Sequence, residues 1–245
     1  MQDKVVVVTG ASAGIGAVLS EQLAGRGASV VLVARRAEVL AGVAAKCGAR
    51  ATAITADVTS RSEVKRVVES ALAAHGRIDV WVNNAGQGIS RPPSELTDED
   101  IDQMMTINVK SAFYGMQEVL PHFKARGTGQ IVNISSMLGR IPAFVPRTAY
   151  AAAKHFLNAL TASFRAELQP THPGIVFSLV SPGVVKTDFG LNATHGGVDS
   201  RQIPGGQTAE EVAAVIVDTI EHQRIDVYTR PDGREMVVGY YATLG

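Results

Sequence analysis

Residues 4–16 read KVVVVTGASAGIG, and this stretch decides the fold. Four consecutive valines form a short, wholly apolar run, which is typical of a parallel strand covered on both faces. Gly10, Gly14 and Gly16 follow, and an amphipathic segment comes next. Glycines permit a tight turn and let backbone N–H groups approach a pyrophosphate, to which the following helix adds positive partial charge. The stretch therefore predicts a strand, a phosphate-binding loop and a helix at the start of a βαβ unit.

The same alternation continues along the whole chain. Seven short runs rich in β-branched residues are separated by longer segments with helical periodicity. These runs are Val5–Thr9, Ser29–Val33, Ala51–Thr55, Ile78–Asn83, Gln130–Ser135, Val176–Val180 and Asp226–Thr229. Repeated βαβ units predict an α/β fold with a doubly wound parallel sheet and helices on both faces. No linker divides the chain, so we expect a single domain over residues 1–245, with a cofactor half of about 1–135 and a catalytic and substrate half of about 136–245.

Composition narrows the range of partners. The chain has 245 residues, 46% of them hydrophobic, and 23 basic residues balance 23 acidic ones. A balanced charge argues against binding to nucleic acid or to an acidic membrane surface. Cys47 is the single cysteine, so no internal disulfide can form. No targeting segment or run of about 20 apolar residues is visible, which predicts a cytoplasmic protein.

The end of the second predicted strand carries information about the cofactor. A site for NAD(H) usually places an acidic residue there, to bind the ribose 2′-hydroxyl. Here the chain reads Ala34-Arg35-Arg36. A guanidinium group binds a 2′-phosphate through two parallel charge-assisted hydrogen bonds. Because cations are also unfavourable at a helix N-terminus, we interpret the pair as a site for NADP(H), with NAD(H) as second choice.

Two further loops follow predicted strands. Asp57-Val58 comes after the third strand, and Asn83-Asn84-Ala85-Gly86 comes after the fourth. Ligands of open α/β sheets bind beyond the carboxyl ends of the strands, so both loops are expected to contact the cofactor.

Tyr150 and Lys154 are the candidate chemical groups. They are four residues apart in a segment with helical periodicity, so they share one helix face. A phenol is a poor base at neutral pH, and a neighbouring ammonium group favours its ionised form. Ser135 and Ser136 end the fifth strand at the same edge of the sheet. Ser136 is expected to hold the substrate oxygen while Tyr150 transfers a proton.

Taken together, these motifs resemble those of the short-chain dehydrogenases/reductases of about 250 residues, over essentially the whole chain. The matching elements, in family order, are Thr9-Gly10-(x)3-Gly14-Ile15-Gly16, Asp57, Asn83-Asn84-Ala85-Gly86, Asn108, Ser136, Tyr150-(x)3-Lys154 and Pro182-Gly183-(x)3-Thr187. The resemblance implies a seven-stranded sheet in the order 3-2-1-4-5-6-7. It also implies an NADP(H)-dependent oxidoreductase that transfers a hydride between the nicotinamide and a carbonyl or secondary alcohol.

The resemblance also assigns roles. Tyr150 is the expected general acid/base, Ser136 orients the substrate oxygen, and Lys154 binds the nicotinamide ribose. Asn108 matches an asparagine that kinks a helix and takes part in a proton relay. Pro182, Gly183 and Thr187 match the loop that contacts the nicotinamide. The remaining expected cofactor contacts are Gly10, Ser12, Ala13, Gly14, Ile15, Gly16, Arg35, Arg36, Asp57, Val58, Asn84, Ala85 and Gly86.

The chain departs from the family pattern in two places. Ala13 stands where many NADP-using members carry a basic residue, so recognition of the 2′-phosphate rests on Arg35 and Arg36. The interval from Ser136 to Tyr150 is one residue longer than in many members, and we assign the extra residue to the loop at 140–148.

The sequence does not identify the substrate. Residues 87–96 and 188–206 are the expected substrate segments, and the glycine-rich second one is interpreted as a lid. Phe144, Val145, Phe189 and Leu191 are candidates for an apolar pocket or for ordinary loop positions, and His195 for a substrate contact or a solvated histidine. The histidines are scattered, and no set of histidines and carboxylates has the spacing of metal ligands, so we expect no catalytic metal.

Two other functions remain open. One is a non-catalytic NADP(H)-binding regulator, although relatives of that kind often lack the tyrosine or the lysine. The other is an epimerase or lyase on the same fold, although those relatives usually have a longer substrate domain.

Two helices bear on assembly. One is predicted to begin at Thr97, where Asp98, Glu99 and Asp100 suit a capping box. The other is predicted from about Thr148 to Leu168 and has hardly any charged stripe. We infer that a second face of this helix is buried, either against another subunit in a homodimer or homotetramer or under the final segment of the chain.

Overall fold

A computed structural model describes residues 1–142 and 144–244 of the chain. Its centre is a seven-stranded parallel sheet in the order β3-β2-β1-β4-β5-β6-β7, as predicted. The strands are β1 (Val5–Thr9), β2 (Ser29–Ala34), β3 (Ala51–Thr55), β4 (Val80–Asn83), β5 (Gly129–Ile134), β6 (Ile175–Ser181) and β7 (Asp226–Tyr228). The order reverses beside β1, so the loops after β1 and β4 open side by side at the carboxyl edge.

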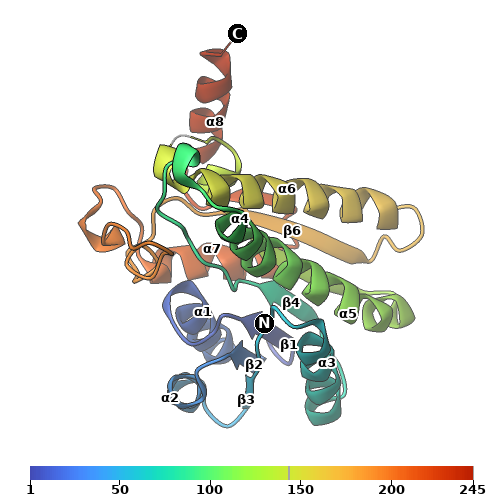
Figure 1. Cartoon of the computed structure of the whole chain (residues 1–245). Helices are drawn as coiled ribbons and strands as arrows, with labels where there is room; N and C mark the ends of the chain where they lie inside the picture. Colours follow the sequence, from blue (N-terminus) through green and yellow to red (C-terminus); the bar gives the residue numbers. More distant parts are fainter. Residues whose placement is uncertain (143, 245) are drawn as a thin grey trace.

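Helices cover both faces of the sheet (Figure 1). On one face lie α1 (Gly14–Gly25), α2 (Ala37–Cys47) and α7 (Ala209–Glu221). On the other lie α3 (Arg61–His75), α5 (Ser111–Arg126) and α6 (Thr148–Leu168). Helix α4 (Asp98–Met105) precedes α5, and α8 (Gly233–Ala242) ends the chain.

Strand β1 shows how one run of valines supplies both cores. Val5 and Val7 pack with α3, α5 and α6, whereas Val6 and Val8 pack with α1, α2 and α7. Alternate side chains of a strand point to opposite faces, so a strand covered on both sides has to be apolar throughout. All four valines are 4% exposed or less.

Strand β4 is shorter than predicted because of Asp79. The sequence pattern suggested a strand from Ile78, but the strand begins at Val80. The Asp79 carboxylate accepts a hydrogen bond of 2.8 Å from the Val5 backbone N–H and pairs with Arg77 and Arg126. A side chain thus replaces part of the backbone ladder. The other strand ends differ from the predictions by one residue at most.

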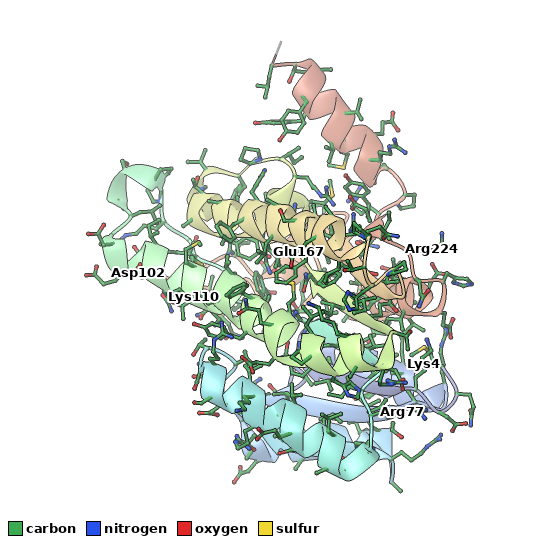
Figure 2. The ribbon with its side chains drawn as sticks, turned by 90° about the vertical axis from the view of Figure 1, so that its right-hand side faces the viewer. Lys4, Arg77, Asp102, Lys110, Glu167 and Arg224 are labelled. Atoms are coloured by element: carbon green, nitrogen blue, oxygen red, sulfur yellow. The ribbon has the colours of Figure 1, made fainter. Side chains whose placement is uncertain are left out.

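The helix predicted from Thr97 has the expected start and an interruption. The Thr97 hydroxyl accepts from the Asp100 backbone N–H, and the Asp100 carboxylate accepts from the Thr97 N–H, which completes a capping box. A π-helical turn at Thr106–Lys110 then separates α4 from α5. Figure 2 labels Asp102 and Lys110 on this path.

The two ends of the chain are placed differently. Met1 contacts the core between the sheet and α7, whereas α8 projects away from the body (Figure 1). None of the helices in the described parts of the chain is both long and apolar enough to span a membrane.

Candidate functional site

The glycine-rich loop after β1 is held against the loop after β4. The Asn84 side-chain amide donates to the backbone carbonyls of Thr9 at 2.9 Å and Gly10 at 3.3 Å. A methyl group at Gly16 would lie only 2.4 Å from the Gly10 carbonyl oxygen and 2.5 Å from Asn84 Nδ2. Gly10 and Gly14 have φ angles of +67° and +53°, which favour glycine. Asn84 thus shapes the loop through its side chain.

The start of α1 fits the phosphate groups of a dinucleotide. Ala13 is the N-cap residue, and no side chain in the described chain caps the first turn. The first N–H groups of a helix have no intrahelical acceptor and carry positive partial charge. Thr187, in the loop after β6, lies opposite, with its Cγ2 atom 3.3 Å from a methyl group built at Gly14. A narrow cradle therefore faces uncapped donors, as a pyrophosphate requires.

Arg35 and Arg36 lie at the carboxyl end of β2, beside this cradle. β2 ends at Ala34, and Arg36 is the N-cap residue of α2. The Arg36 guanidinium donates 3.1 Å to the Ser12 hydroxyl of the glycine-rich loop. No ion pair between described residues includes either arginine. Both charges are therefore available at the place where the ribose of a dinucleotide would lie.

Asp57 and Val58 follow β3 at the same edge. The Asp57 carboxylate accepts 3.0 Å and 2.7 Å hydrogen bonds from the Thr59 N–H and hydroxyl. Val58 packs against the core on the α3 side. These contacts fix the turn that leads into α3.

Tyr150 and Lys154 lie one turn apart on α6, and both are buried. The Lys154 Nζ atom lies 5.6 Å from the centre of the Tyr150 ring and donates 2.9 Å to the Ile134 carbonyl. Burial lowers the pKa of Lys154 to about 8, so the amine remains mostly protonated at neutral pH.

Burial has the opposite effect on the phenol, because its ionised form is the charged one. It raises the pKa of Tyr150 to about 12, while Ser136 and the charge of Arg147 act to lower it. The sequence had led us to expect that Lys154 lowers the pKa of the Tyr150 phenol toward neutral pH, and the direction in the structure is the opposite. A phenol with so high a pKa is protonated at neutral pH and is suited to donate a proton.

Ser135 and Ser136 have different surroundings. The Ser135 hydroxyl donates 2.5 Å to Asn158 Oδ1, and the Asn158 amide donates 2.6 Å to the Gly139 carbonyl. The Ser136 oxygen accepts 3.1 Å from the Leu138 N–H, so its own proton is free to donate elsewhere. Met137, the next residue, donates its N–H to the Pro182 carbonyl at 2.7 Å, which draws the loop after β6 toward Ser136.

Asn108 lies within the π-helical turn that interrupts the path from α4 to α5. Its amide donates to the carbonyls of Gln87 at 2.9 Å and Met104 at 3.2 Å, and its oxygen accepts 3.1 Å from the Gln87 N–H. A methyl group at Gly86 would lie 2.9 Å from Asn108 Oδ1 and 3.5 Å from Lys154 Nζ. Asn108, Gly86 and Lys154 therefore lie close together, one helical turn from Tyr150.

The segment at 188–206 folds back over this edge. The Thr194 N–H donates 2.9 Å to the Gly88 carbonyl, and the Ser90 N–H donates 3.0 Å to the Thr194 carbonyl. Phe189 packs edge-on against Tyr150, with 5.6 Å between ring centres. Phe144, Val145, Phe189 and Leu191 are all exposed.

His195 is an exposed residue whose side chain contacts an acidic residue of α4. Its Nε2 atom lies 2.7 Å from Asp100 Oδ1, and Arg91 Nη1 lies 2.9 Å from Asp100 Oδ2. Arg91 and His195 hold the pKa of Asp100 well below its usual range. The three side chains join α4, the loop after β4 and the 188–206 segment.

Sequence reasoning did not single out Arg147. It lies three residues before Tyr150, within the 140–148 loop, where residue 143 falls outside the described residues. Its Nη1 atom is buried and has no hydrogen-bond partner among the described residues. A cation at the very start of a helix is unfavourable for the helix dipole, and that was the available sequence signal.

Comparisons with known proteins agree with this geometry. The family model described as short chain dehydrogenase matches residues 4–196. An uncharacterized oxidoreductase of Staphylococcus epidermidis is 35% identical over 196 residues, covering 78% of this chain and 84% of the relative.

Two solved structures are also similar. The 3-ketoacyl-(acyl-carrier-protein) reductase from Brucella melitensis, complexed with NADH, is 26% identical, with a TM-score of 0.83 and coverage of 93% of this chain and 98% of that one. The alcohol dehydrogenase from the archaeon Thermococcus sibiricus, complexed with 5-hydroxy-NADP, is 26% identical, with a TM-score of 0.81 and coverage of 92% and 95%. The chain is an oxidoreductase of the short-chain dehydrogenase family.

Proposed function

We propose that the protein is an NADP(H)-dependent oxidoreductase that interconverts a carbonyl compound and its secondary alcohol, with Tyr150 as general acid/base. The observation that carries the proposal is a buried phenol whose ring centre lies 5.6 Å from the Lys154 ammonium, with Ser136 close enough to lower the pKa of the phenol. The bound nicotinamide would supply or accept the hydride. The cofactor half is about 1–135, and the catalytic and substrate half is about 136–245.

The residues around the reacting carbonyl have separate roles. Ser136 donates a hydrogen bond to the carbonyl oxygen and keeps its proton, while its own oxygen accepts from the Leu138 N–H. Tyr150, protonated at neutral pH, gives its proton to the same oxygen as negative charge develops there. Lys154 provides positive charge beneath the ring. Asn108 holds the Gln87 backbone, and with it the loop that borders the substrate.

The cofactor residues act through backbone and charge. The uncapped N–H groups of Gly14, Ile15 and Gly16, together with Ser12, would bind the pyrophosphate. Val58, Ala85 and Gly86 would bind the adenosine half of the cofactor, and Pro182, Gly183 and Thr187 would bind the nicotinamide half.

Arg35 and Arg36 would bind the 2′-phosphate, since no carboxylate occupies the end of β2. The two similar structures hold NADH and an NADP derivative, so they do not distinguish the two cofactors. Our choice of NADP(H) is supported by the positive charge of Arg35 and Arg36.

A Tyr150→Phe variant tests the chemistry. We expect NADPH-dependent reduction of aldehydes, ketones and diketones to fall by about 10²- to 10⁴-fold, because the proton donor is lost. NADPH binding, followed by its fluorescence, should be unchanged. Turnover that survives in Tyr150→Phe would instead favour a different acid, and binding without turnover in the wild type would favour a regulator.

An Arg35→Ala variant tests the cofactor. We expect KM for NADPH to rise by about 10-fold or more, since a charge-assisted pair with the phosphate is lost. KM for NADH should remain the same. Arg50→Ala is the control, because Arg50 pairs with Asp3 at the opposite edge of the sheet. A wild-type preference for NADH would contradict the assignment.

A further inference from the structure

Arg147 is a cation that the proposed chemistry does not use. It is the N-cap residue of α6, one turn before Tyr150. Its guanidinium forms no ion pair or hydrogen bond with any described residue, and Nη1 is shielded from solvent. Leaving a buried charged donor without an acceptor costs more than leaving a neutral one. Such a group is either compensated by a ligand or kept at a cost to stability.

The surroundings of Arg147 are built to admit its guanidinium. A methyl group at Gly88 would lie 2.2 Å from Arg147 Nη1, and one at Gly197 would lie 2.9 Å from Nη2. Neither glycine has a positive φ that would itself require glycine. Gly88 therefore keeps space for the guanidinium, whereas a methyl group at Gly197 would first meet the Gly190 carbonyl oxygen, at 2.5 Å. The guanidinium lies between the loop after β4 and the 188–206 segment. Both segments belong to the substrate side of the site.

Lys154 and Arg147 lie on opposite sides of Tyr150 along α6. Lys154 points inward, to the Ile134 carbonyl and toward Gly86. Arg147 points outward, among Gly88, Phe189 and Gly197. The ammonium group thus faces the expected cofactor side, and the guanidinium faces the space that a substrate would fill beyond its carbonyl.

Two acidic residues of the surrounding elements, Asp100 on α4 and Asp188 in the 188–206 segment, are already paired. Asp100 binds Arg91 and His195, and Asp188 binds Arg201. Burial lowers the pKa of Arg147, and Tyr150 acts to raise it. The protein therefore provides no carboxylate of its own, within the described residues, to neutralise this guanidinium.

We propose that Arg147 binds an oxyanion of the substrate, so that the protein acts on carbonyl compounds or alcohols that carry a carboxylate or a phosphate. This inference rests on the proposed reaction at Tyr150 and adds the substrate class. A guanidinium group presents paired N–H donors that suit both anions. The substrate would place its carbonyl at Tyr150 and Ser136 and its anion at Arg147.

Matched pairs of compounds test the proposal by turnover. We would compare 2-oxo, 3-oxo and 4-oxo carboxylic acids with their methyl esters, and dihydroxyacetone phosphate with dihydroxyacetone. The wild type should favour the anionic member of at least one pair in kcat/KM by about 10- to 100-fold, as expected for a charged hydrogen bond. The pair with the larger preference shows whether the ligand of Arg147 is a carboxylate or a phosphate. A preference for the neutral member in every pair would overturn the proposal.

Three variants separate recognition from folding. Arg147→Gln should lose the anion preference while keeping turnover of the neutral compound. Gly88→Ala should also reduce the preference, since it displaces the guanidinium but keeps its charge. Arg26→Gln removes an equal charge from an arginine that pairs with Glu221 at the end of α1 away from the site, and it should change nothing. Equal losses on anionic and neutral compounds in Arg147→Gln would assign the residue a structural role only and overturn the proposal.

A binding measurement decides the case if no compound turns over. Calorimetric titration of the NADPH complex with the same acids and the phosphate should show binding that is lost in Arg147→Gln and absent for the esters. Binding without turnover would contradict the reaction at Tyr150 but support the anion site. Equal binding to wild type and Arg147→Gln, or no binding of any anion, would overturn the anion site.

Discussion

Tyr150 combines two opposing influences at the scale of a single residue. Burial raises its pKa to about 12, while Ser136 and Arg147 act to lower it. The neutral phenol suits carbonyl reduction, where a proton is donated. Alcohol oxidation needs the phenolate, which the positive charge of an oxidised nicotinamide would favour further.

This difference predicts how the two directions respond to pH. Reduction should be independent of pH through the neutral range, because the phenol is already protonated. It should decline above about pH 8, where Lys154 begins to lose its proton. Oxidation should rise with pH over the neutral range, because more of the phenol is ionised. Profiles of kcat/KM in both directions check this, and a reduction rate that rises from pH 6 to 8 would contradict it.

The positions of several site residues could be predicted from the sequence, and the contacts of others could not. Tyr150, Lys154 and Ser136 come together because strand ends and helix spacing fix their positions. The separate role of Ser135 could not be predicted, because it depends on Asn158, a residue 23 positions away. Arg147 was missed for a similar reason, since its unpaired state is defined by Gly88 and Gly197, which lie in distant segments.

At the scale of elements, the 188–206 segment is tied to α4 by one cluster. His195 reaches Asp100, which also pairs with Arg91 and caps α4. The glycine content of this segment predicted a lid, but its attachment could not be read from the pattern. The attachment is a contact between side chains 95 positions apart.

A His195→Ala variant should loosen this attachment. We expect KM for the carbonyl substrate to rise several-fold while KM for NADPH stays the same, because Phe189 in the same segment packs on Tyr150. The Thr97–Asp100 cap remains, so the thermal transition of the whole protein should change little. Steady-state kinetics with each substrate varied in turn measures the split. An unchanged KM for the carbonyl compound would show that the backbone bonds at Thr194 hold the segment alone.

At the scale of the whole molecule, α6 leaves one side open. Its exposed positions Ala152, Phe156, Ala159 and Ser163 are spaced along one face, and Phe156 is 49% exposed. The final segment does not cover this face, because α8 projects away from the body (Figure 1). In Figure 2, α5 and α6 run beside each other, with Glu167 near the end of α6. Of the two explanations drawn from the sequence, burial against a second subunit is the one that we develop.

We therefore propose a homodimer or homotetramer that pairs α6 with its copy. Phe156→Glu should place a charge in that interface and convert the assembly to a smaller species. Light scattering after gel filtration measures this. Val39→Glu is the control, because Val39 is similarly exposed at 44% but lies on α2, on the other face of the sheet. A wild-type monomer, or an unchanged Phe156→Glu assembly, would contradict the proposal.

The fold itself could be predicted almost completely, because the alternation of apolar strands and amphipathic helices leaves few topologies open. The exact start of β4 and the π turn at Asn108 depend on individual side-chain contacts, at Asp79 and Gln87, that have no periodic signal. The arrangement of subunits could not be predicted either. An apolar helix face suggests an interface but does not specify how two copies would pack.

The most direct test of the central claim follows the hydride itself. NADPH labelled with deuterium at both hydrogens of nicotinamide C4 would be incubated with the protein and the best carbonyl compound, and the product analysed by mass spectrometry. We predict one deuterium on the carbinol carbon of the alcohol, formed by the wild type and about 10²- to 10⁴-fold more slowly by Tyr150→Phe. Substrate conversion without deuterium in the product, or equal transfer by Tyr150→Phe, would contradict it.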